Sequence, residues 1–166
     1  MLDESKAASY VPTCGDLRIF TFFGPAMNLS TSSDLGLEAR PRFIDNDDGT
    51  ITDTVLRLIW SKATLCGVER VSYAEAAEAC KALGQEWRLP TRVELFQLVD
   101  DTRCSPAIDT AAFPDTMGGA YWTATEYALV PLCVRVVGFI SGRADGCHRD
   151  EVRNFVRAVR SLPAST

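Results

Sequence analysis

Two stretches of this chain say most about its fold: Arg42-Phe43-Ile44-Asp45-Asn46-Asp47-Asp48-Gly49-Thr50-Ile51-Thr52-Asp53 and Trp87-Arg88-Leu89-Pro90-Thr91-Arg92-Val93-Glu94-Leu95. The first predicts a β-hairpin, because Asp48-Gly49 separates two strand-forming runs and glycine tolerates the positive φ of a tight turn. The second predicts a loop that leads into a helix capped at Thr91. Neither stretch carries a catalytic nucleophile, a metal-ligand cluster or a phosphate-binding loop, so both describe a scaffold.

The acidic residues of the first stretch also suggest a calcium-binding loop. If Gly49 took the sixth position of an EF-hand loop, the first and twelfth positions would fall on Ile44 and Val55. Neither of these side chains has an oxygen ligand to offer. The register therefore favours the hairpin, and we expect neither a metal nor another cofactor.

Length and composition are those of one globular domain with an N-terminal arm. The chain has 166 residues, of which 46% are hydrophobic, and its mean hydropathy is near zero. No apolar run approaches the roughly 20 residues of a membrane-spanning helix, so we expect no membrane insertion. Residues 1–41 form the predicted arm, with one strand at residues 17–23, and residues 42–166 form the predicted domain. The arm's strand either pairs with the main sheet or docks another protein.

Charge is distributed unevenly along the chain. The net charge is −5, yet residues 132–166 carry six basic and three acidic side chains, against eleven basic and nineteen acidic in the remainder. An acidic body argues against nucleic acid as a partner. The positive C-terminal part nevertheless permits a local surface for anions.

The middle of the chain predicts a strand at residues 54–60 followed by two capped helices. Ser72 with Glu75 forms a capping box for a helix that ends at Gly84. Thr91 with Glu94 forms a second capping box, for a helix that continues through Val99. Asp100 and Asp101 then lie at the negative end of that helix, which is unfavourable and hints at a partner for them.

The last third of the chain predicts β-structure. Strands are expected at residues 121–125, 132–140 and 155–160, and Ser141-Gly142 is expected to form a two-residue turn. Two helices followed by a strand-rich part indicate an α+β domain.

Six cysteines without any Cys-x-x-Cys pair favour disulfides over buried free thiols, and hence a periplasmic or extracellular address. No signal peptide is visible at the start of the sequence. Cys133 and Cys147 are candidates for a cross-strand bridge. The two-residue turn would place their sulfurs on opposite faces, so the bridge requires a bulge at Asp145-Gly146.

Several short motifs in a fixed order resemble one known family, the C-terminal domain of Legionella collagen-like adhesins. The motifs are the hairpin stretch, Leu58-Ile59-Trp60, Tyr73-Ala74-Glu75-Ala76, Trp87-Arg88-Leu89-Pro90-Thr91, Tyr121-Trp122-Thr123-Ala124-Thr125 and Val156-Arg157-Ala158-Val159-Arg160. The resemblance covers about residues 42–161. It implies a C-type-lectin-like fold with two helices and a mainly antiparallel sheet.

The same resemblance implies a secreted or surface-attached bacterial protein that binds glycans or sulfated polysaccharides such as glycosaminoglycans. This sequence departs from the family at Ala158, where a cysteine often stands that can bridge back to the first helix. Cys80 must then pair elsewhere, with Cys66 as the nearest candidate, or stay free. The Glu-Pro-Asn and Trp-Asn-Asp motifs of calcium-dependent lectins are also missing.

The residues favour binding over catalysis. His148 is the only histidine, and no hydrolase or phosphate-binding motif accompanies it. Arginine offers a planar fork of donors to sulfate or carboxylate, and an aromatic ring can stack on a sugar. The expected ligand-binding residues are Arg135, Arg143, His148, Arg149, Arg153 and Tyr121. Tyr121 and Trp122 are alternatively core residues, which we favour for Trp122, and Arg157 and Arg160 are expected on a solvated strand edge.

Two functions remain open. The first is a non-enzymatic adhesin module that binds a glycan or another polyanion, with affinity that falls as salt rises. The second is a protein-interaction or display module that binds another protein through the N-terminal arm and the lectin-like face. Related domains also make a homo-oligomer possible.

Overall fold

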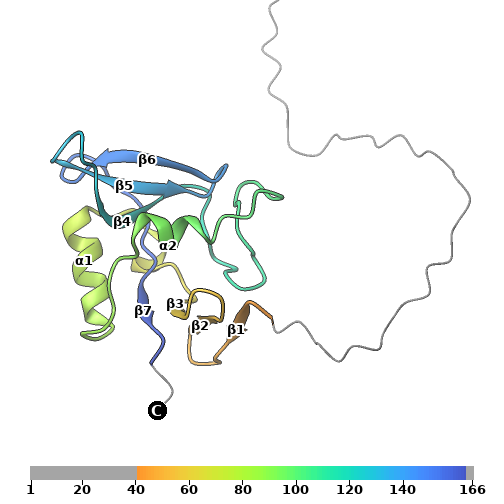
Figure 1. Cartoon of the computed structure of the whole chain (residues 1–166). Coiled ribbons are helices and arrows are strands. Elements are labelled where there is room, and N and C mark those ends of the chain that lie inside the picture. The colour runs from red at the N-terminus through yellow and green to blue at the C-terminus, as the bar shows by residue number, and fades with distance from the viewer. Residues whose placement is uncertain (1–40, 164–166) are drawn as a thin grey trace, which may run out of the picture. The chain divides into compact units, whose positions relative to one another are not determined.

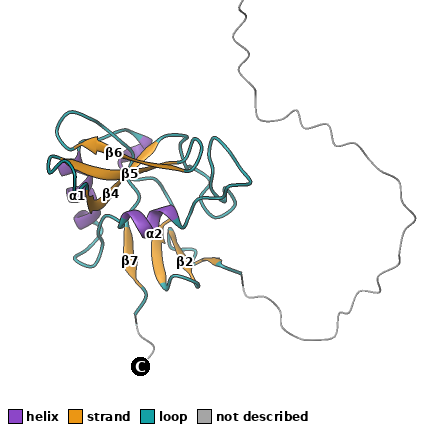
Figure 2. Ribbon diagram, turned by 45° about the horizontal axis from the view of Figure 1, so that its top comes forward, coloured by secondary structure: helices purple, strands orange, loops and turns teal. Residues whose placement is uncertain are grey.

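The structure is a computed structural model and describes residues 41–163. Two helices and two antiparallel sheets confirm the α+β class (Figures 1 and 2). The first sheet has the order β1-β2-β3-β7, with strands Phe43–Asp45, Thr50–Asp53, Leu58–Ser61 and Val159–Ser161. The second has the order β4-β5-β6, with strands Ala120–Glu126, Cys133–Gly138 and Arg143–His148. Helices α1 and α2 span Tyr73–Ala82 and Arg92–Phe96, and a short 3-10 turn spans Cys66–Val68.

The β-strands are divided between two sheets, and α2 lies between these sheets in both views (Figures 1 and 2). The C-type-lectin-like part of the fold prediction stays a prediction. The predicted arm strand at residues 17–23 lies outside the described residues.

The predicted hairpin is confirmed by the pairing of β1 with β2. In its turn the Asp45 carboxylate accepts the amide of Asp47 at 3.1 Å, and the Asp48 carboxylate accepts the amide of Thr50 at 3.0 Å. Gly49 has a φ of 83°, as the turn requires. The acidic side chains that suggested calcium therefore stabilise the turn instead.

Both predicted capping boxes are present. Ser72 Oγ accepts the amide of Glu75, and the Glu75 carboxylate accepts the amide of Ser72 at 2.7 Å. Thr91 and Glu94 make the same reciprocal pair at the start of α2, also with a 2.7 Å bond to the carboxylate. Each box satisfies amides that would otherwise be unpaired at a helix start.

Helix α2 ends earlier than the sequence predicts. It stops at Phe96, and the chain continues in a tighter turn that leads to Asp100. The Asp100 carboxylate accepts the amide of Thr102 at 3.0 Å and pairs with Arg103 at 2.9 Å. The carboxylate that looked misplaced at a helix end thus caps the next turn.

Strand β3 also begins later than predicted, because residues 54–57 turn around a buried carboxylate. Asp53 is fully buried and accepts the amides of Val55 and Leu56 at 3.0 Å each. Arg57 then takes a φ of 53°, which is incompatible with a continuous strand.

The connection between β5 and β6 has four residues instead of two. Gly138 pairs with Arg143, because Phe139 leaves the strand to enter the core, where it is fully buried. The register then runs without a bulge to Cys133 opposite His148. Cys133 and Cys147 consequently point to opposite faces.

The four cysteines Cys66, Cys80, Cys133 and Cys147 are free thiols. The predicted Cys133–Cys147 bridge is therefore wrong, since the bulge that it required does not form. Cys80 is buried in the same core as Ala158, and burial, together with Cys66, raises the pKa of its thiol to about 12.

The segment 155–159 links two hydrophobic cores. Phe155 and Val159 belong to a core built on the four-stranded sheet and α2. Val156 and Ala158 belong to a second core that contains Trp122 and residues of α1. The chain therefore alternates between the cores, and only residues 159–161 of the predicted strand pair as β7.

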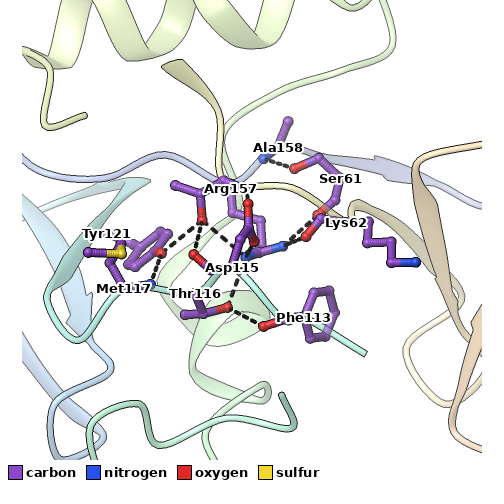
Figure 3. Close-up of polar contacts among 10 residues, drawn as sticks. Ser61, Lys62, Phe113, Asp115, Thr116, Met117, Tyr121, Arg157 and Ala158 are labelled. Atoms are coloured by element: carbon purple, nitrogen blue, oxygen red, sulfur yellow. Dashed lines mark hydrogen bonds and ion pairs between the residues drawn. The ribbon is translucent and has the colours of Figure 1, made fainter. Parts of the chain in front are cut away.

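Arg157, in the middle of this segment, is fully buried, so its expected place on a solvated edge is wrong. Figure 3 shows its guanidinium at the meeting point of two loops. It donates to the carbonyls of Ser61 at 2.6 Å and Lys62 at 2.5 Å, and to Thr116 Oγ1 at 3.0 Å. Arg160, by contrast, is partly exposed and lies 3.7 Å from the exposed carboxylate of Glu86.

Candidate functional site

Tyr121 cannot contact a ligand, which corrects one of the predicted site residues. Its side chain is fully buried, and its ring packs 5.2 Å from Phe139 and 5.3 Å from Phe155. Its hydroxyl accepts the amide of Met117 at 2.9 Å. Strand β4 lies between the two cores, so consecutive aromatic side chains on opposite faces are both buried there.

Arg135 and His148 lie on the same face of the second sheet. Arg135 is opposite Gly146, and His148 is two residues further along β6. The Arg135 guanidinium stacks 3.9 Å from the ring centre of Tyr127. A side chain at position 146 would meet that ring at 2.8 Å, so Gly146 makes room for the stack.

Arg149 and Arg153 are held near the first turn of α1. Arg149 pairs with Glu126 at 2.9 Å, which raises the pKa of its guanidinium, and it lies 5.4 Å from the ring of Tyr73. Arg153 pairs with Glu75 at 3.3 Å. The hydrogen bond from the Ser72 amide is the main cause of a lowered pKa at Glu75, and Arg153 adds to it.

Four of the predicted residues lie around the ends of β4 and β6 and the start of α1, and we call them the arginine cluster: Arg135, His148, Arg149 and Arg153. Glu126 and Tyr127, adjacent at the end of β4, contact Arg149 and Arg135 respectively. Tyr73 and Glu75, from one helical turn, contact Arg149 and Arg153. Glu126 and Tyr127 are consecutive, so the contacts of Arg135 and of Arg149 meet at the end of β4, and Arg149 and Arg153 meet at the start of α1.

Arg143 does not belong to this cluster. It begins β6, about 17 Å along the strand from His148, and its register places it on the opposite face from Arg135 and His148. The structure therefore brings together four of the six predicted residues and separates Arg143 and Tyr121 from them.

An aromatic groove, which the sequence analysis missed, borders the cluster at Tyr73. It has a volume of about 330 Å³ and lies between α1, the loop before α2 and β4. Its lining residues are Tyr73, Ala77, Lys81, Trp87, Arg88, Leu89, Thr91 and Ala124. In the sequence, the groove could have been sought from the four-residue spacing of Tyr73, Ala77 and Lys81, which places these side chains on one face of the helix.

Within residues 41–163 no three metal-ligating side chains of the types His, Cys, Asp and Glu are grouped. His148 Nδ1 accepts the amide of Asp150 at 3.3 Å. None of the helices in these residues is both long and apolar enough to cross a bilayer.

The fold and this surface define an α+β scaffold that displays a group of arginines beside an aromatic groove. The family described as the Lcl C-terminal domain matches residues 49–160, which is well over half of the chain, and the chain belongs to this family. This confirms the family that the ordered motifs indicated. A comparison with curated proteins gave no match.

Proposed function

We propose that this chain is a non-enzymatic, adhesin-like module that binds sulfated or other anionic glycans at the arginine cluster. The observation that carries the proposal is the connected array of three guanidinium groups around the end of β4 and the start of α1. Membership of the Lcl family supports the adhesin-like part of the proposal. The protein that contains this module is secreted, periplasmic or attached to the bacterial surface.

The cluster's arginines are available to an anion at small cost. Arg149 and Arg153 are paired only with exposed carboxylates, since Glu126 is 77% and Glu75 53% exposed. Such surface pairs contribute at most about 1 kcal/mol each. Among the described residues, Arg135 has an aromatic partner but no carboxylate within ion-pair distance. A sulfate ester can therefore displace these partners and gain charge-assisted hydrogen bonds.

Stacking further prepares two of the guanidiniums for binding. Arg135 is held over Tyr127 and Arg149 over Tyr73. Held side chains lose less conformational entropy when a ligand binds, so more of the interaction energy appears as affinity.

Binding of dextran sulfate and of unsulfated dextran by biolayer interferometry tests the proposal. The double variant Arg135→Gln/Arg149→Gln should weaken dextran sulfate binding about tenfold or more, since each lost charge-assisted contact costs about 1 kcal/mol or more. The matched control is Arg57→Gln/Arg103→Gln, elsewhere on the domain. Arg57 is exposed and has no ion pair within residues 41–163, and Arg103 pairs with Asp100 and Asp109. Equal weakening by both variants would show that only net charge matters, and would refute the cluster.

A second candidate function, protein interaction, is supported by the connection between β4 and β5. Leu129 is 79%, Leu132 60% and Val130 42% exposed there, and clustered exposed apolar residues mark protein contacts. Sedimentation of the wild type and of Leu129→Ser/Leu132→Ser tests this function for a second copy of the chain as partner. An oligomer that the substitutions dissociate supports it, and a wild-type monomer argues against self-association.

A further inference from the structure

The aromatic groove has an apolar floor and two aromatic walls. Ala77, Leu89 and Ala124 contribute apolar surface, and Tyr73 and Trp87 contribute half-buried rings. Its volume of about 330 Å³ is in the lower part of the range of small-molecule sites. The groove is therefore large enough for one or two rings of a ligand.

Both aromatic side chains are fixed by other contacts. Tyr73 meets Trp122 edge to face at 5.6 Å, with Arg149 over its ring. Trp87 lies 5.3 Å from the guanidinium of Arg160, and its amide donates to the carbonyl of Gly84 at 3.1 Å. These contacts order the rings before a ligand arrives, which lowers the entropic cost of binding.

The charges around the groove cancel in pairs. Arg88 binds Glu94 at 2.7 Å through a two-bond fork, and Lys81 binds Glu78 at 2.9 Å. The two cations that cover the aromatic rings are also paired, Arg149 with Glu126 and Arg160 with Glu86. The cations at the groove are therefore each paired with a carboxylate, so the groove carries no unpaired charge among the described residues.

We propose that this groove binds a neutral pyranose, that is, an uncharged sugar ring of an oligosaccharide. The C–H face of a pyranose is apolar and matches the negative face of an aromatic ring. Its hydroxyl groups both donate and accept hydrogen bonds, so they can use carboxylates and cations of the rim alike. An apolar peptide side chain would cover the same floor but would desolvate the rim without new hydrogen bonds, which is costly.

This site is distinct from the proposed function, because the groove shares only its border at Tyr73 with the arginine cluster and its ligand has no charge. Either site can be present without the other. The groove predicts affinity that does not change with salt, whereas the cluster predicts affinity that falls with salt.

Intrinsic fluorescence provides a specific readout. Trp60 and Trp122 are fully buried, whereas Trp87 is half-buried in the groove. We expect neutral gluco-, galacto- or manno-oligosaccharides to change Trp87 emission and to protect it from acrylamide, with a Kd on the order of 1 mM. Saturation should be the same at low and high salt.

Ala124→Tyr tests the location, because this exposed alanine on β4 lines the groove and a tyrosine is tolerated in a strand. Ala128→Tyr, at an exposed alanine outside the groove, is the matched control. Thermal unfolding verifies that both variants fold, and unchanged dextran sulfate binding by both verifies the separate cluster. Loss of the sugar signal in Ala124→Tyr alone supports the proposal. It is overturned if no member of the neutral panel affects Trp87, if both variants respond alike, or if an apolar peptide binds while the sugars do not.

Discussion

Replacement of Arg157 by methionine should destabilise the domain strongly, although the position follows a pattern typical of a strand edge. Methionine keeps the apolar stem and removes the guanidinium. The carbonyls of Ser61 and Lys62 then lose their donor, as does Thr116 Oγ1. The guanidinium also lies 4.6 Å over the ring of Phe113, and this contact is lost as well.

The magnitude follows from these lost contacts. Hydrogen bonds to a charged donor contribute about 1.5–3 kcal/mol each, so the two carbonyls alone account for about 3–6 kcal/mol. Removal of the buried charge returns part of this, because burial of a guanidinium is itself unfavourable and lowers its pKa here. We expect a net loss of about 3 kcal/mol, equivalent to about 6–12 °C in Tm for a domain of this size.

The assay is urea unfolding followed by tryptophan fluorescence, together with thermal unfolding. Arg160→Met is the control from the same motif: its side chain is 26% exposed and its ion pair with Glu86 spans 3.7 Å, so it should lose at most about 1 kcal/mol. If Arg157→Met does not fold, Thr116→Val removes one hydrogen bond of Arg157 together with the bond from Thr116 Oγ1 to the carbonyl of Phe113, and it should lose about 2–4 kcal/mol. Equal losses for Arg157→Met and Arg160→Met would refute the buried role of Arg157.

Three further predictions concern acid stability, thiol reactivity and the arginine cluster. Burial favours a higher pKa at Glu94, but hydrogen bonds from Arg88 and Thr91 outweigh burial and lower this pKa below its ordinary 4.5. The ionised Glu94 therefore stabilises the fold above pH 4.5, and this stabilisation is lost as pH falls through the lowered pKa. Glu94→Gln should accordingly flatten the acid branch of a curve of unfolding free energy against pH. Cys80, with a pKa raised to about 12, should not react with a thiol reagent at pH 8 until the protein unfolds, whereas exposed Cys66 should react in the folded protein. Equal rates of modification at Cys66 and Cys80 would contradict the burial of Cys80. Gly146→Ala should displace Tyr127 and weaken dextran sulfate binding several-fold. Gly142→Ala, at a more crowded glycine with a positive φ in the connection between β5 and β6, should strain the fold without a comparable loss of binding.

Local sequence signals predicted local structure well. The hairpin turn at Asp48-Gly49 and the two capping boxes were predicted correctly, because each forms through interactions within a few residues. The turn depends on the positive φ of a glycine, and the boxes depend on the unpaired amides at a helix start. The strand at residues 54–60 was predicted too early, since the turn around Asp53 depends on a carboxylate that binds amides two and three residues ahead.

Long-range features were not predictable from these signals. The burial of Arg157 depends on carbonyls about 95 residues away in sequence, at Ser61 and Lys62. The groove likewise combines α1, a loop and β4, which no local pattern connects. Of the candidate ligand residues, the arginines that follow β6 were found from their place in the late, strand-rich part of the sequence, whereas Tyr127, Tyr73 and Trp87 required the fold.

The salt dependence of dextran sulfate binding tests most directly whether this chain holds an anionic glycan at the arginine cluster. Log affinity plotted against log salt should fall linearly from about 50 mM to about 500 mM, and each cluster arginine removed should reduce the slope by about 0.7–0.9. The recovered polysaccharide should keep its chain length and sulfate content. A slope unchanged in Arg135→Gln/Arg149→Gln, or a shortened or desulfated polysaccharide, would contradict a binding module that leaves its ligand intact.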